Sequence, residues 1–283
     1  MKIAFASGKG GTGKSTIART FANYIAKDKH VSLIDADVEE PNQLLFFKAS
    51  TTEASKPVSL PIPVIDNDIC SKCGACVKFC NYNALSLNKK GVTVFPELCH
   101  ACGGCSMVCP INCISETPHE IGETTLAHNK NISLIQGKLA IGSSHATPLI
   151  EELLKRAPQN KTTIIDSPPG SACSLMAVAN AVDAIVLVAE PTPFGLANLE
   201  TVVDVCEELE LLFGVVINRC NMGNTCVLDF CQKHDIEILA EIPWYYDVAS
   251  SCQPISQLES HFNTQNNPMQ KLAEAVSKWE AEC

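Results

Sequence analysis

The chain has 283 residues, of which 46% are hydrophobic and 18% are charged, a composition typical of globular proteins. Its formal net charge of −10 at pH 7 argues against nucleic acid or an anionic membrane surface as the main partner. The first residues read as an apolar strand and not as a signal peptide, and no apolar run approaches the roughly 18 residues that span a bilayer. We therefore expect a cytoplasmic protein with one large domain, or with one domain that carries an insertion.

The first motif is a glycine-rich loop at 8–16, GKGGTGKST, which fits the phosphate-binding P-loop pattern G-x-x-x-x-G-K-[ST]. Its glycines allow a tight turn that aims backbone N–H groups at phosphate oxygens. Lys14 is expected to reach the β- and γ-phosphates, and the Ser15 hydroxyl to bind Mg²⁺. An apolar strand precedes the loop and a helical pattern follows it, an order that a chance glycine-rich turn does not explain. The residues expected to bind nucleotide are Gly8, Lys9, Gly10, Gly11, Thr12, Gly13, Lys14, Ser15 and Thr16.

Two aspartates follow the second predicted strand, at 31–35. Asp35 ends that strand, and Asp37 lies two residues further on. Ligands of open α/β sheets bind outside the carboxyl ends of the strands, so both side chains are candidates for the nucleotide site. An isolated D-x-D pattern is more often a helix cap or a turn, but this one lies one crossover after the P-loop.

Sixteen cysteines are the most unusual feature of the composition. After a Ser-, Thr- and Pro-rich stretch at 48–63 that reads as a linker, the spacing C-x₂-C-x₂-C-x₃-C occurs twice. Ferredoxins use this spacing to bind [4Fe–4S] clusters, and in two-cluster proteins the fourth cysteine of each run ligates the other cluster. We predict one cluster on Cys70, Cys73, Cys76 and Cys109, and the other on Cys99, Cys102, Cys105 and Cys80.

Zinc and disulfides are the alternatives for these cysteines. A cytosolic protein keeps its thiols reduced, which argues against disulfides. Zinc sites combine paired C-x₂-C units and close with four ligands, unlike two interleaved triplets. Cys113 is an additional thiol close to the second run, and a small buried residue is a simpler interpretation for it than a ligand.

The remainder of the chain predicts a sheet. Short strands are expected at 124–128 and 132–135, a helix at 148–156, and apolar strands at 162–166, 183–190, 211–218 and 236–243. The strand at 162–166 ends in Asp166, and a last helix places Met269, Leu272, Val276 and Trp279 on one face. We predict an α/β fold: a doubly wound, mostly parallel P-loop NTPase sheet at 1–59 and 119–283, with a small α+β bacterial-type ferredoxin domain inserted at 60–118.

The loop also fits K-G-G-x-G-K-[ST], the deviant Walker A motif of the MinD and nitrogenase-reductase class. Together with the ferredoxin spacing, this makes nearly the whole chain similar to MinD-superfamily P-loop ATPases that contain an inserted ferredoxin domain. The resemblance implies that Lys9, otherwise a solvated loop lysine, contacts phosphate across a nucleotide-sandwich dimer. It also makes Lys9, Lys14 and Asp37 the catalytic residues, with Asp37 positioning or activating the attacking water.

The same resemblance implies roles for residues at other strand ends. Asp35 would hold Mg²⁺ through its water shell, and Asp166 would bond a magnesium-bound water in a Walker B or switch II segment. Asn218 would read the adenine edge, with a strand-terminating asparagine as the alternative. Cys173 lies at the offset from Asp166 where nitrogenase reductase has a ligand of an intersubunit cluster. No counterpart for that site's other cysteine is evident, so a third metal site and a buried or switch-linked thiol both stay open.

These features favour an ATPase, binding ATP or ADP with Mg²⁺, that couples nucleotide state to electron transfer through two [4Fe–4S] clusters. The expected partners are a second copy or a paralogue in a dimer, and a low-potential electron-transfer protein or a metallocluster client protein; neither nucleic acid nor a membrane is expected. The alternative is an ATP-dependent factor in the assembly or maturation of an iron–sulfur or other metallocluster protein, although the C-terminal C-x-x-C of Mrp-type carriers is absent from this sequence. Positioning on a membrane, as in MinD, is disfavoured because the last predicted helix of this chain is not basic.

Overall fold

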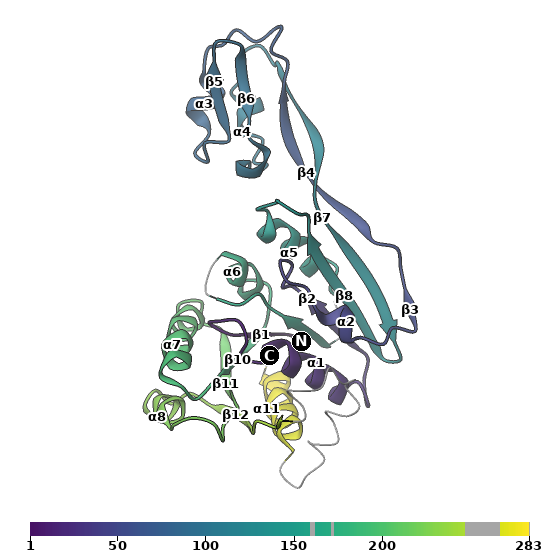
Figure 1. The fold of residues 1–283 in the computed structure, drawn as a ribbon, viewed down its shortest axis with the longest axis vertical. Helices are drawn as coiled ribbons and strands as arrows, with labels where there is room; N and C mark the ends of the chain where they lie inside the picture. Colours follow the sequence, from purple (N-terminus) through teal and green to yellow (C-terminus); the bar gives the residue numbers. More distant parts are fainter. Residues whose placement is uncertain (159–161, 171–172, 247–266, 283) are drawn as a thin grey trace. The chain divides into compact units, whose positions relative to one another are not determined.

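The computed structural model describes residues 1–158, 162–170, 173–246 and 267–282 (Figure 1). Contacts divide the chain into two compact units. The sheet unit comprises Met1–Ser55, Thr124–Lys138 and Ile150–Cys283, and the cysteine-rich unit comprises Lys56–Glu123 and Leu139–Leu149. Neither unit is continuous in sequence, so each is assembled from segments that the other separates.

Parallel strands form the centre of the sheet unit. Strands in the order β12-β11-β10-β1-β9-β2-β8 pair parallel with their neighbours, and β7 follows at the end of this series. Strand β3 pairs antiparallel with β7, so the sheet is mixed but mostly parallel. The α/β prediction with a mostly parallel sheet is therefore confirmed. The strand bounds are β1 Lys2–Ala6, β2 Val31–Asp35, β3 Thr51–Thr52, β7 Ile114–Asn129, β8 Ile132–Leu139, β9 Thr162–Asp166, β10 Ala184–Ala189, β11 Leu212–Asn218 and β12 Ile238–Ile242.

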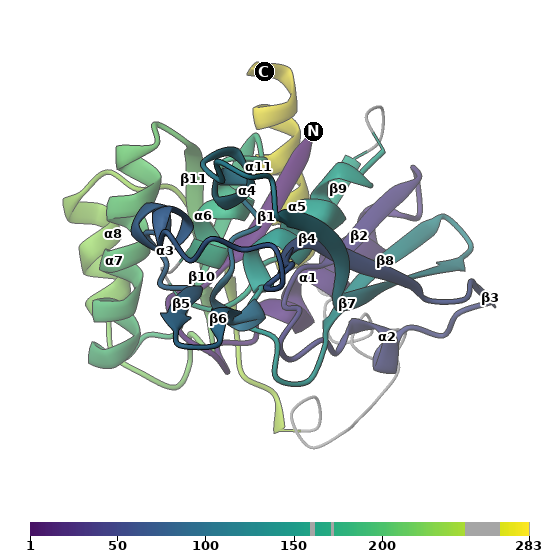
Figure 2. The ribbon, with the colours of Figure 1, turned by 90° about the horizontal axis from the view of Figure 1, so that it is seen from above.

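Helices cover the central strands, which are buried on both faces. Every residue of β2, β9 and β10 is buried, as the continuous apolar runs predicted. Helix α7 contacts β10, α8 contacts β11, and the two helices contact each other (Figure 2). The helix bounds in this unit are α1 Lys14–Ile25, α2 Gln43–Phe46, α6 Cys173–Ala179, α7 Pro193–Glu208, α8 Cys226–Lys233 and α11 Pro268–Glu282.

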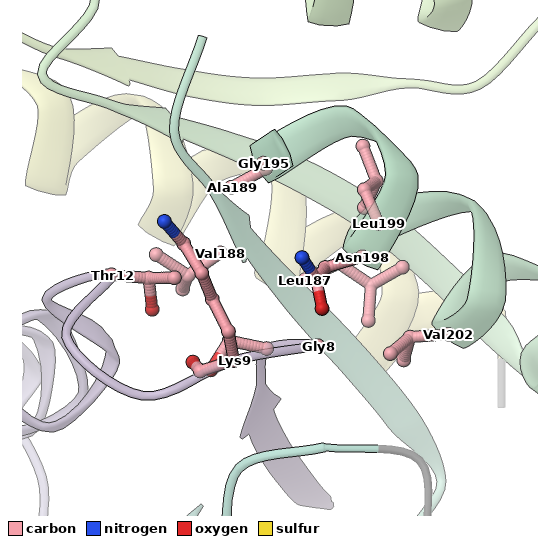
Figure 3. Close-up of a pocket in the computed structure, with 11 residues that line it drawn as sticks. Gly8, Lys9, Thr12, Leu187, Val188, Ala189, Gly195, Asn198, Leu199 and Val202 are labelled. Carbon is pink, nitrogen blue, oxygen red and sulfur yellow. The ribbon is translucent and has the colours of Figure 1, made fainter. Parts of the chain in front are cut away.

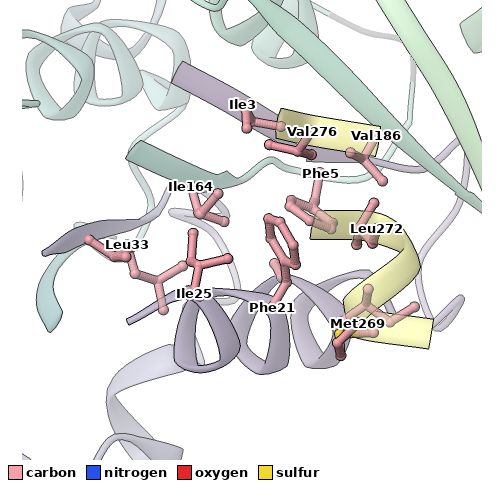
Figure 4. Packing of buried hydrophobic residues seen from close by; sticks show 14 of the residues in the cluster. Ile3, Phe5, Phe21, Ile25, Leu33, Ile164, Val186, Met269, Leu272 and Val276 are labelled. Carbon is pink, nitrogen blue, oxygen red and sulfur yellow. The ribbon is translucent and has the colours of Figure 1, made fainter. Parts of the chain in front are cut away.

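The main core lies between the sheet and helices α1 and α11 (Figure 4). Phe5 of β1 and Phe21 of α1 are both fully buried, and their ring centroids are 5.7 Å apart. The four apolar residues predicted on one face of the last helix are at most 3% exposed, so α11 packs on the core as expected. This packing sets the position of α1, whose first residue is Lys14 of the P-loop.

The cysteine-rich unit contains short elements around cysteines. Its strands are β4 Lys56–Ile65, β5 Leu85–Asn88 and β6 Gly91–Val94, its helices are α3 Ala75–Phe79 and α4 Gly104–Met107, and η1 Pro96–Leu98 is a 3₁₀ turn. Strands β5 and β6 form an antiparallel hairpin, and β4 pairs with β7. Helix α5 Ala146–Lys155 begins in a segment of this unit and ends in a segment of the sheet unit.

Three expectations need correction. The stretch at 48–63 is not a linker, because it contains β3 and most of β4. The strand expected at 124–128 is part of the 16-residue strand β7. The first half of β7 is polar and exposed, so a search for apolar residues did not predict it. Residues 139–149, which the sequence placed in the nucleotide domain, belong to the compact cysteine-rich unit. Among the described residues, no helix is long and apolar enough to cross a membrane.

Candidate nucleotide site and cysteine cavities

The P-loop connects the end of β1 to the start of α1. Gly11 and Gly13 have φ values of 81° and 90°, a left-handed conformation that favours glycine. A Cβ on Gly13 would overlap the side-chain amide of Asn218, whereas one on Gly10 or Gly11 would meet nothing within 4 Å. The loop is therefore packed against the sheet on one side and open on the other, as a phosphate-binding loop must be.

Lys14 is buried against a carboxylate. Its Nζ lies 2.5 Å from Oδ1 of Asp166, at side-chain exposures of 5% and 0%. Asp166 ends β9, which pairs with β1, and this pairing brings the end of the strand next to the loop. In this structure Asp166 neutralises the lysine that is expected to bind phosphate, because a buried charge needs an opposite charge nearby.

Asp35 ends β2 beside Asp166 and has one unsatisfied oxygen. Its Oδ2 accepts backbone N–H bonds from Asn42 at 3.0 Å and Gln43 at 2.9 Å, while its fully buried Oδ1 has no partner. Burial, with the nearby negative charge of Asp166, raises the pKa of Asp35 to about 7. An unpartnered buried carboxylate oxygen is the kind of ligand that Mg²⁺ or its bound water prefers, so this site fits magnesium.

Asp37 lies two residues beyond the end of β2 and is half-buried. Burial raises its pKa, and the nearby Lys14 opposes that shift. Ser15, the other predicted magnesium ligand, lies in the first turn of α1, and its backbone carbonyl accepts a 3.0 Å bond from the Gln43 side chain. The structure therefore brings Lys14, Asp35 and Asp166 into one group.

Gln43 is a functional candidate that the sequence analysis missed. Its side chain is fully buried, and its Nε2 donates to Asp166 Oδ2 at 2.6 Å. Its Oε1 accepts a long 3.4 Å bond from Arg19. Arg19 is itself buried, which lowers its pKa, and its guanidinium lies 4.3 Å from the Phe46 ring centroid. Nothing in the sequence around Gln43 distinguishes it from a surface residue, because its partners are up to 123 positions away.

Glu190 is a second residue that the sequence analysis left without a role. It follows the last residue of β10, and its Oε2 lies 2.6 Å from Lys9 Nζ. Its Oε1 also pairs with the guanidinium of Arg219, which follows β11. The rule that found Asp35 and Asp166, a carboxylate at the end of a buried strand, would have found Glu190 as well.

A small pocket lies between the P-loop, the end of β10 and α7, and Gly8, Lys9 and Thr12 line its P-loop side (Figure 3). A Cβ on Gly8 would overlap the Asn198 backbone, so glycine is required for this close approach. Asn218 Nδ2 donates to the carbonyl of Thr12 at 2.6 Å. Its predicted contact with adenine stays a prediction; in this structure Asn218 fastens the end of β11 to the P-loop.

The eight predicted ligand cysteines line two separate cavities in the cysteine-rich unit. One cavity is lined by Cys70, Cys73, Cys76 and Cys109. The other is lined by Cys80, Cys99, Cys102 and Cys105. The first three cysteines of each run thus share a cavity with the fourth cysteine of the other run.

The two cysteine runs have the same backbone conformation at equivalent positions. Positive φ angles occur at Lys72 and Ala101, at Gly74 and Gly103, and again at Asn83 and Asn112. Cys70 and Cys99 each accept a 3.4 Å bond from the backbone N–H two residues later. N–H groups that point at sulfur stabilise thiolates, and the two loops place such groups at the same position.

A single metal ion does not fit these cysteines. Within the described ranges, no group of three or more His, Cys, Asp or Glu side chains is placed to hold one ion. Zinc needs such convergence, because its four ligands surround one atom at about 2.0–2.3 Å. A cluster whose irons each take one thiolate tolerates a wider spacing.

The other cysteines differ in their surroundings. Cys113 is buried, as expected, and lines the same cavity as Cys109, with 3.5 Å between the two sulfurs. Burial raises the pKa of Cys113 to about 12. Cys173 is exposed, which contradicts the buried-thiol interpretation of this residue. Cys206 and Cys231 are buried and Cys220 and Cys226 half-buried, whereas Cys252 and Cys283 lie outside the described residues.

These features define a P-loop nucleotide-binding protein. The first strand of a mostly parallel sheet leads through the P-loop to a buried lysine, and carboxylates lie at the ends of adjacent strands. The family model of the CobQ/CobB/MinD/ParA nucleotide binding domain matches residues 3–253, and the chain belongs to this family. It is thus a MinD/ParA-like nucleotide-binding protein.

The chain is also similar to two relatives in sequence and to solved structures in fold. The chain is 32% identical over 250 residues to an uncharacterized protein of Methanocaldococcus jannaschii, covering 88% of this chain and 86% of that protein. A second uncharacterized protein of that organism is 27% identical over 231 residues, covering 79% and 82%. The fold is similar to the septum site-determining protein MinD of Pyrococcus horikoshii, solved with Mg-ADP, at a TM-score of 0.60 and 17% identity over 98% of this chain and 96% of that one. MinD of Pyrococcus furiosus gives a TM-score of 0.59 at 17% identity, over 98% of each chain.

Proposed function

We propose that this protein hydrolyses ATP and couples its nucleotide state to electron transfer through two [4Fe–4S] clusters in the cysteine-rich unit. The single observation that supports this proposal most is the pair of cavities, each lined by four cysteines drawn from both runs. Such an exchange of the fourth cysteine is the ligation pattern of two-cluster ferredoxins. When bound, these clusters supply one-electron transfer at low potential.

The residues present fit the clusters. Each cavity has four of the predicted ligand thiols, and three of these eight sulfurs, those of Cys70, Cys99 and Cys109, accept bonds from backbone N–H groups. Cys73 and Cys102 are exposed, while Cys76, Cys99 and Cys105 are buried. Each cluster would therefore have an edge near solvent at which a partner protein can exchange electrons. A low-potential electron-transfer protein is the partner that this chemistry requires.

ATP hydrolysis requires the chain's own residues to change partners. Lys14 would leave Asp166 for the β- and γ-phosphates, since a phosphate offers more negative charge than one carboxylate. Asp166 and the unpartnered oxygen of Asp35 would then be free to hold the water shell of Mg²⁺, with the Ser15 hydroxyl as a direct ligand. Asp37 would orient the attacking water, and Mg²⁺ would neutralise charge on the phosphates.

Lys9 would act across a dimer of this chain with itself or with a paralogue. Lys9 is half-buried and its ammonium lies 2.6 Å from Glu190, so it would leave this carboxylate to reach a nucleotide bound by another subunit. The cysteine-rich unit lies in the sequence between the segments that carry Asp35 and Asp166, and the chain crosses between the two units at 55/56, 123/124, 138/139 and 149/150. On hydrolysis, the segments that carry Asp35 and Asp166 would move, and this movement would change the environment of the clusters.

Iron content tests the clusters first. Anaerobically reconstituted protein should contain about eight irons and show sulfide-to-iron absorption in the visible range. Cys73→Ser and Cys102→Ser should each lower the iron content to about four, because each removes a ligand from a different cluster. Cys226→Ser, outside both cavities, is the matched control. Iron-free protein that binds one zinc per cysteine run would refute the proposal.

Electron coupling is tested on the reconstituted protein. The electron paramagnetic resonance spectrum of the reduced clusters should differ between the ATP analogue and ADP states, and Lys14→Gln should remove this difference while leaving the iron content unchanged. Identical spectra in both states would refute coupling. Transfer of iron to an apo-acceptor, with no electron transfer, would instead favour the assembly function.

A further inference from the structure

We propose that Glu190 holds Lys9 on its own subunit and releases it when the phosphates of a nucleotide bound by a second copy of the chain compete for it. Glu190 would thereby regulate how much nucleotide is needed for dimer formation. This inference rests on the proposed nucleotide-sandwich dimer and deepens it, because it names the residue that controls the lysine acting across the interface.

Three charged side chains carry this inference. Glu190 has a side-chain exposure of 9% and pairs with Lys9 through one oxygen, at 2.6 Å, and with Arg219 through the other. The cations are more exposed, at 23% for Lys9 and 40% for Arg219. The carboxylate is therefore fixed between two cations that can each reach solvent.

The sheet determines where Glu190 lies. Strands β1 and β10 are parallel neighbours, with Ala6 opposite Leu187. Glu190, which follows β10, therefore lies next to the P-loop residues that follow β1. Helix α7 starts close by, and a Cβ on Gly195 would overlap the carbonyl of Glu190. Thr192 caps this helix by accepting a 3.0 Å bond from the Gly195 N–H. The backbone on both sides of Glu190 is thus held firmly.

Arg219 is what makes the contact reversible. If Lys9 left a buried carboxylate that had no other partner, an uncompensated charge would remain, which is costly. Arg219 would keep Glu190 paired, and its own position is supported by a second bond from Nη2 to the carbonyl of Gly11, at 3.3 Å. Its backbone N–H also bonds Asn218 Oδ1 at 3.0 Å. Lys9 can therefore exchange its partner at little cost.

The departing ammonium also has a path to the surface. Lys9 Nζ lies 5.0 Å from the ring centroid of Phe194, close enough for a cation–π interaction. Phe194 is 67% exposed at the start of α7, so this contact lies at the protein surface. A second copy that approaches this edge would meet Lys9, Arg219 and an exposed aromatic ring together.

The test measures the concentration of a non-hydrolysable ATP analogue at which half of the protein is dimeric, by sedimentation velocity. Glu190→Gln removes the negative charge and should lower this concentration by about fivefold or more, the size of a typical coupling between sites. Arg219→Gln should raise it by a similar factor, since Glu190 would then bind Lys9 more tightly. The double variant should behave like Glu190→Gln, because Arg219 would have no carboxylate to satisfy. Glu200→Gln, an exposed charge change on α7, is the control and should not change it.

Three outcomes would overturn the inference. If Glu190→Gln dimerises at the wild-type concentration, Glu190 does not restrain Lys9. If the double variant is as weak as Arg219→Gln, Arg219 contacts nucleotide itself and the exchange does not occur. If the wild-type chain binds the analogue and stays monomeric, the proposed dimer fails, and that result is distinct from the first two. Thermal unfolding of each variant establishes that it is folded.

Discussion

Replacing Gln43 offers the most direct test of how the nucleotide site is held together. Its fully buried amide joins Asp166 of β9 to the Ser15 carbonyl of α1, at 2.6 and 3.0 Å. Gln43→Ala removes both bonds and leaves their partners in a buried space. We expect the sheet unit to lose stability, and the segment after β2 to lose its attachment to the P-loop.

The magnitude follows from the partners. A hydrogen bond to an ionised carboxylate contributes about 1.5–3 kcal/mol, and a neutral bond to a carbonyl about 1 kcal/mol. The 3.4 Å bond from Arg19 is long, and we assign it little. Gln43→Ala should therefore lower the free energy of unfolding by about 3 kcal/mol, a loss that mutational surveys associate with broken buried networks.

Urea unfolding followed by tryptophan fluorescence measures this loss. Both tryptophans of the chain, Trp244 and Trp279, belong to the sheet unit, so the signal reports that unit alone. Gln270→Ala is a matched control, because the Gln270 amide also bonds a carboxylate, that of Glu274 at 2.9 Å, but on the exposed surface. The control should lose less than about 0.5 kcal/mol. A Gln43→Ala variant as stable as this control would refute the proposed role.

Three further predictions address the loop, a titrating carboxylate and the core. Gly13→Ala should weaken nucleotide binding, measured by nucleotide titration, and lower the free energy of unfolding in urea by more than about 1 kcal/mol. The reason is that the φ of Gly13 is 90° and that a Cβ on this residue would overlap Asn218. Gly10→Ala is the control, and it should change the free energy of unfolding by less than about 0.5 kcal/mol because a Cβ on Gly10 meets open space. Without nucleotide and Mg²⁺, the free energy of unfolding should fall as the pH rises from about 4 to 7. The pKa of Asp35 is about 7 in the folded protein and about 3.9 in the unfolded chain, so the folded protein binds this proton more tightly. Asp35→Asn should flatten this part of the pH profile, and an unchanged slope would contradict the raised pKa. Phe21→Ala should cost about 3–5 kcal/mol in urea unfolding, because the ring is fully buried against β1 and α11; a loss below about 1 kcal/mol would contradict the packing.

Local patterns in the sequence were enough to predict several parts of this protein. The P-loop, its strand and its helix are contiguous, so one motif described all three. Asp35 and Asp166 follow apolar runs and lie at strand ends, as parallel-sheet geometry requires. The cysteine spacing predicted two sets of four residues, and each set lines one cavity. In these cases the information lies within a few neighbouring residues.

Only the tertiary structure decided which distant side chains meet. Gln43 and Asp166 are 123 positions apart, and Lys9 contacts Glu190 because β10 pairs with β1. Strand β4, read as a linker from its composition, exists because β7 pairs with it. A hydrogen-bonding partner that comes from another strand leaves no trace in the local sequence, so pairing and burial, and not residue type alone, turned these residues into parts of a site.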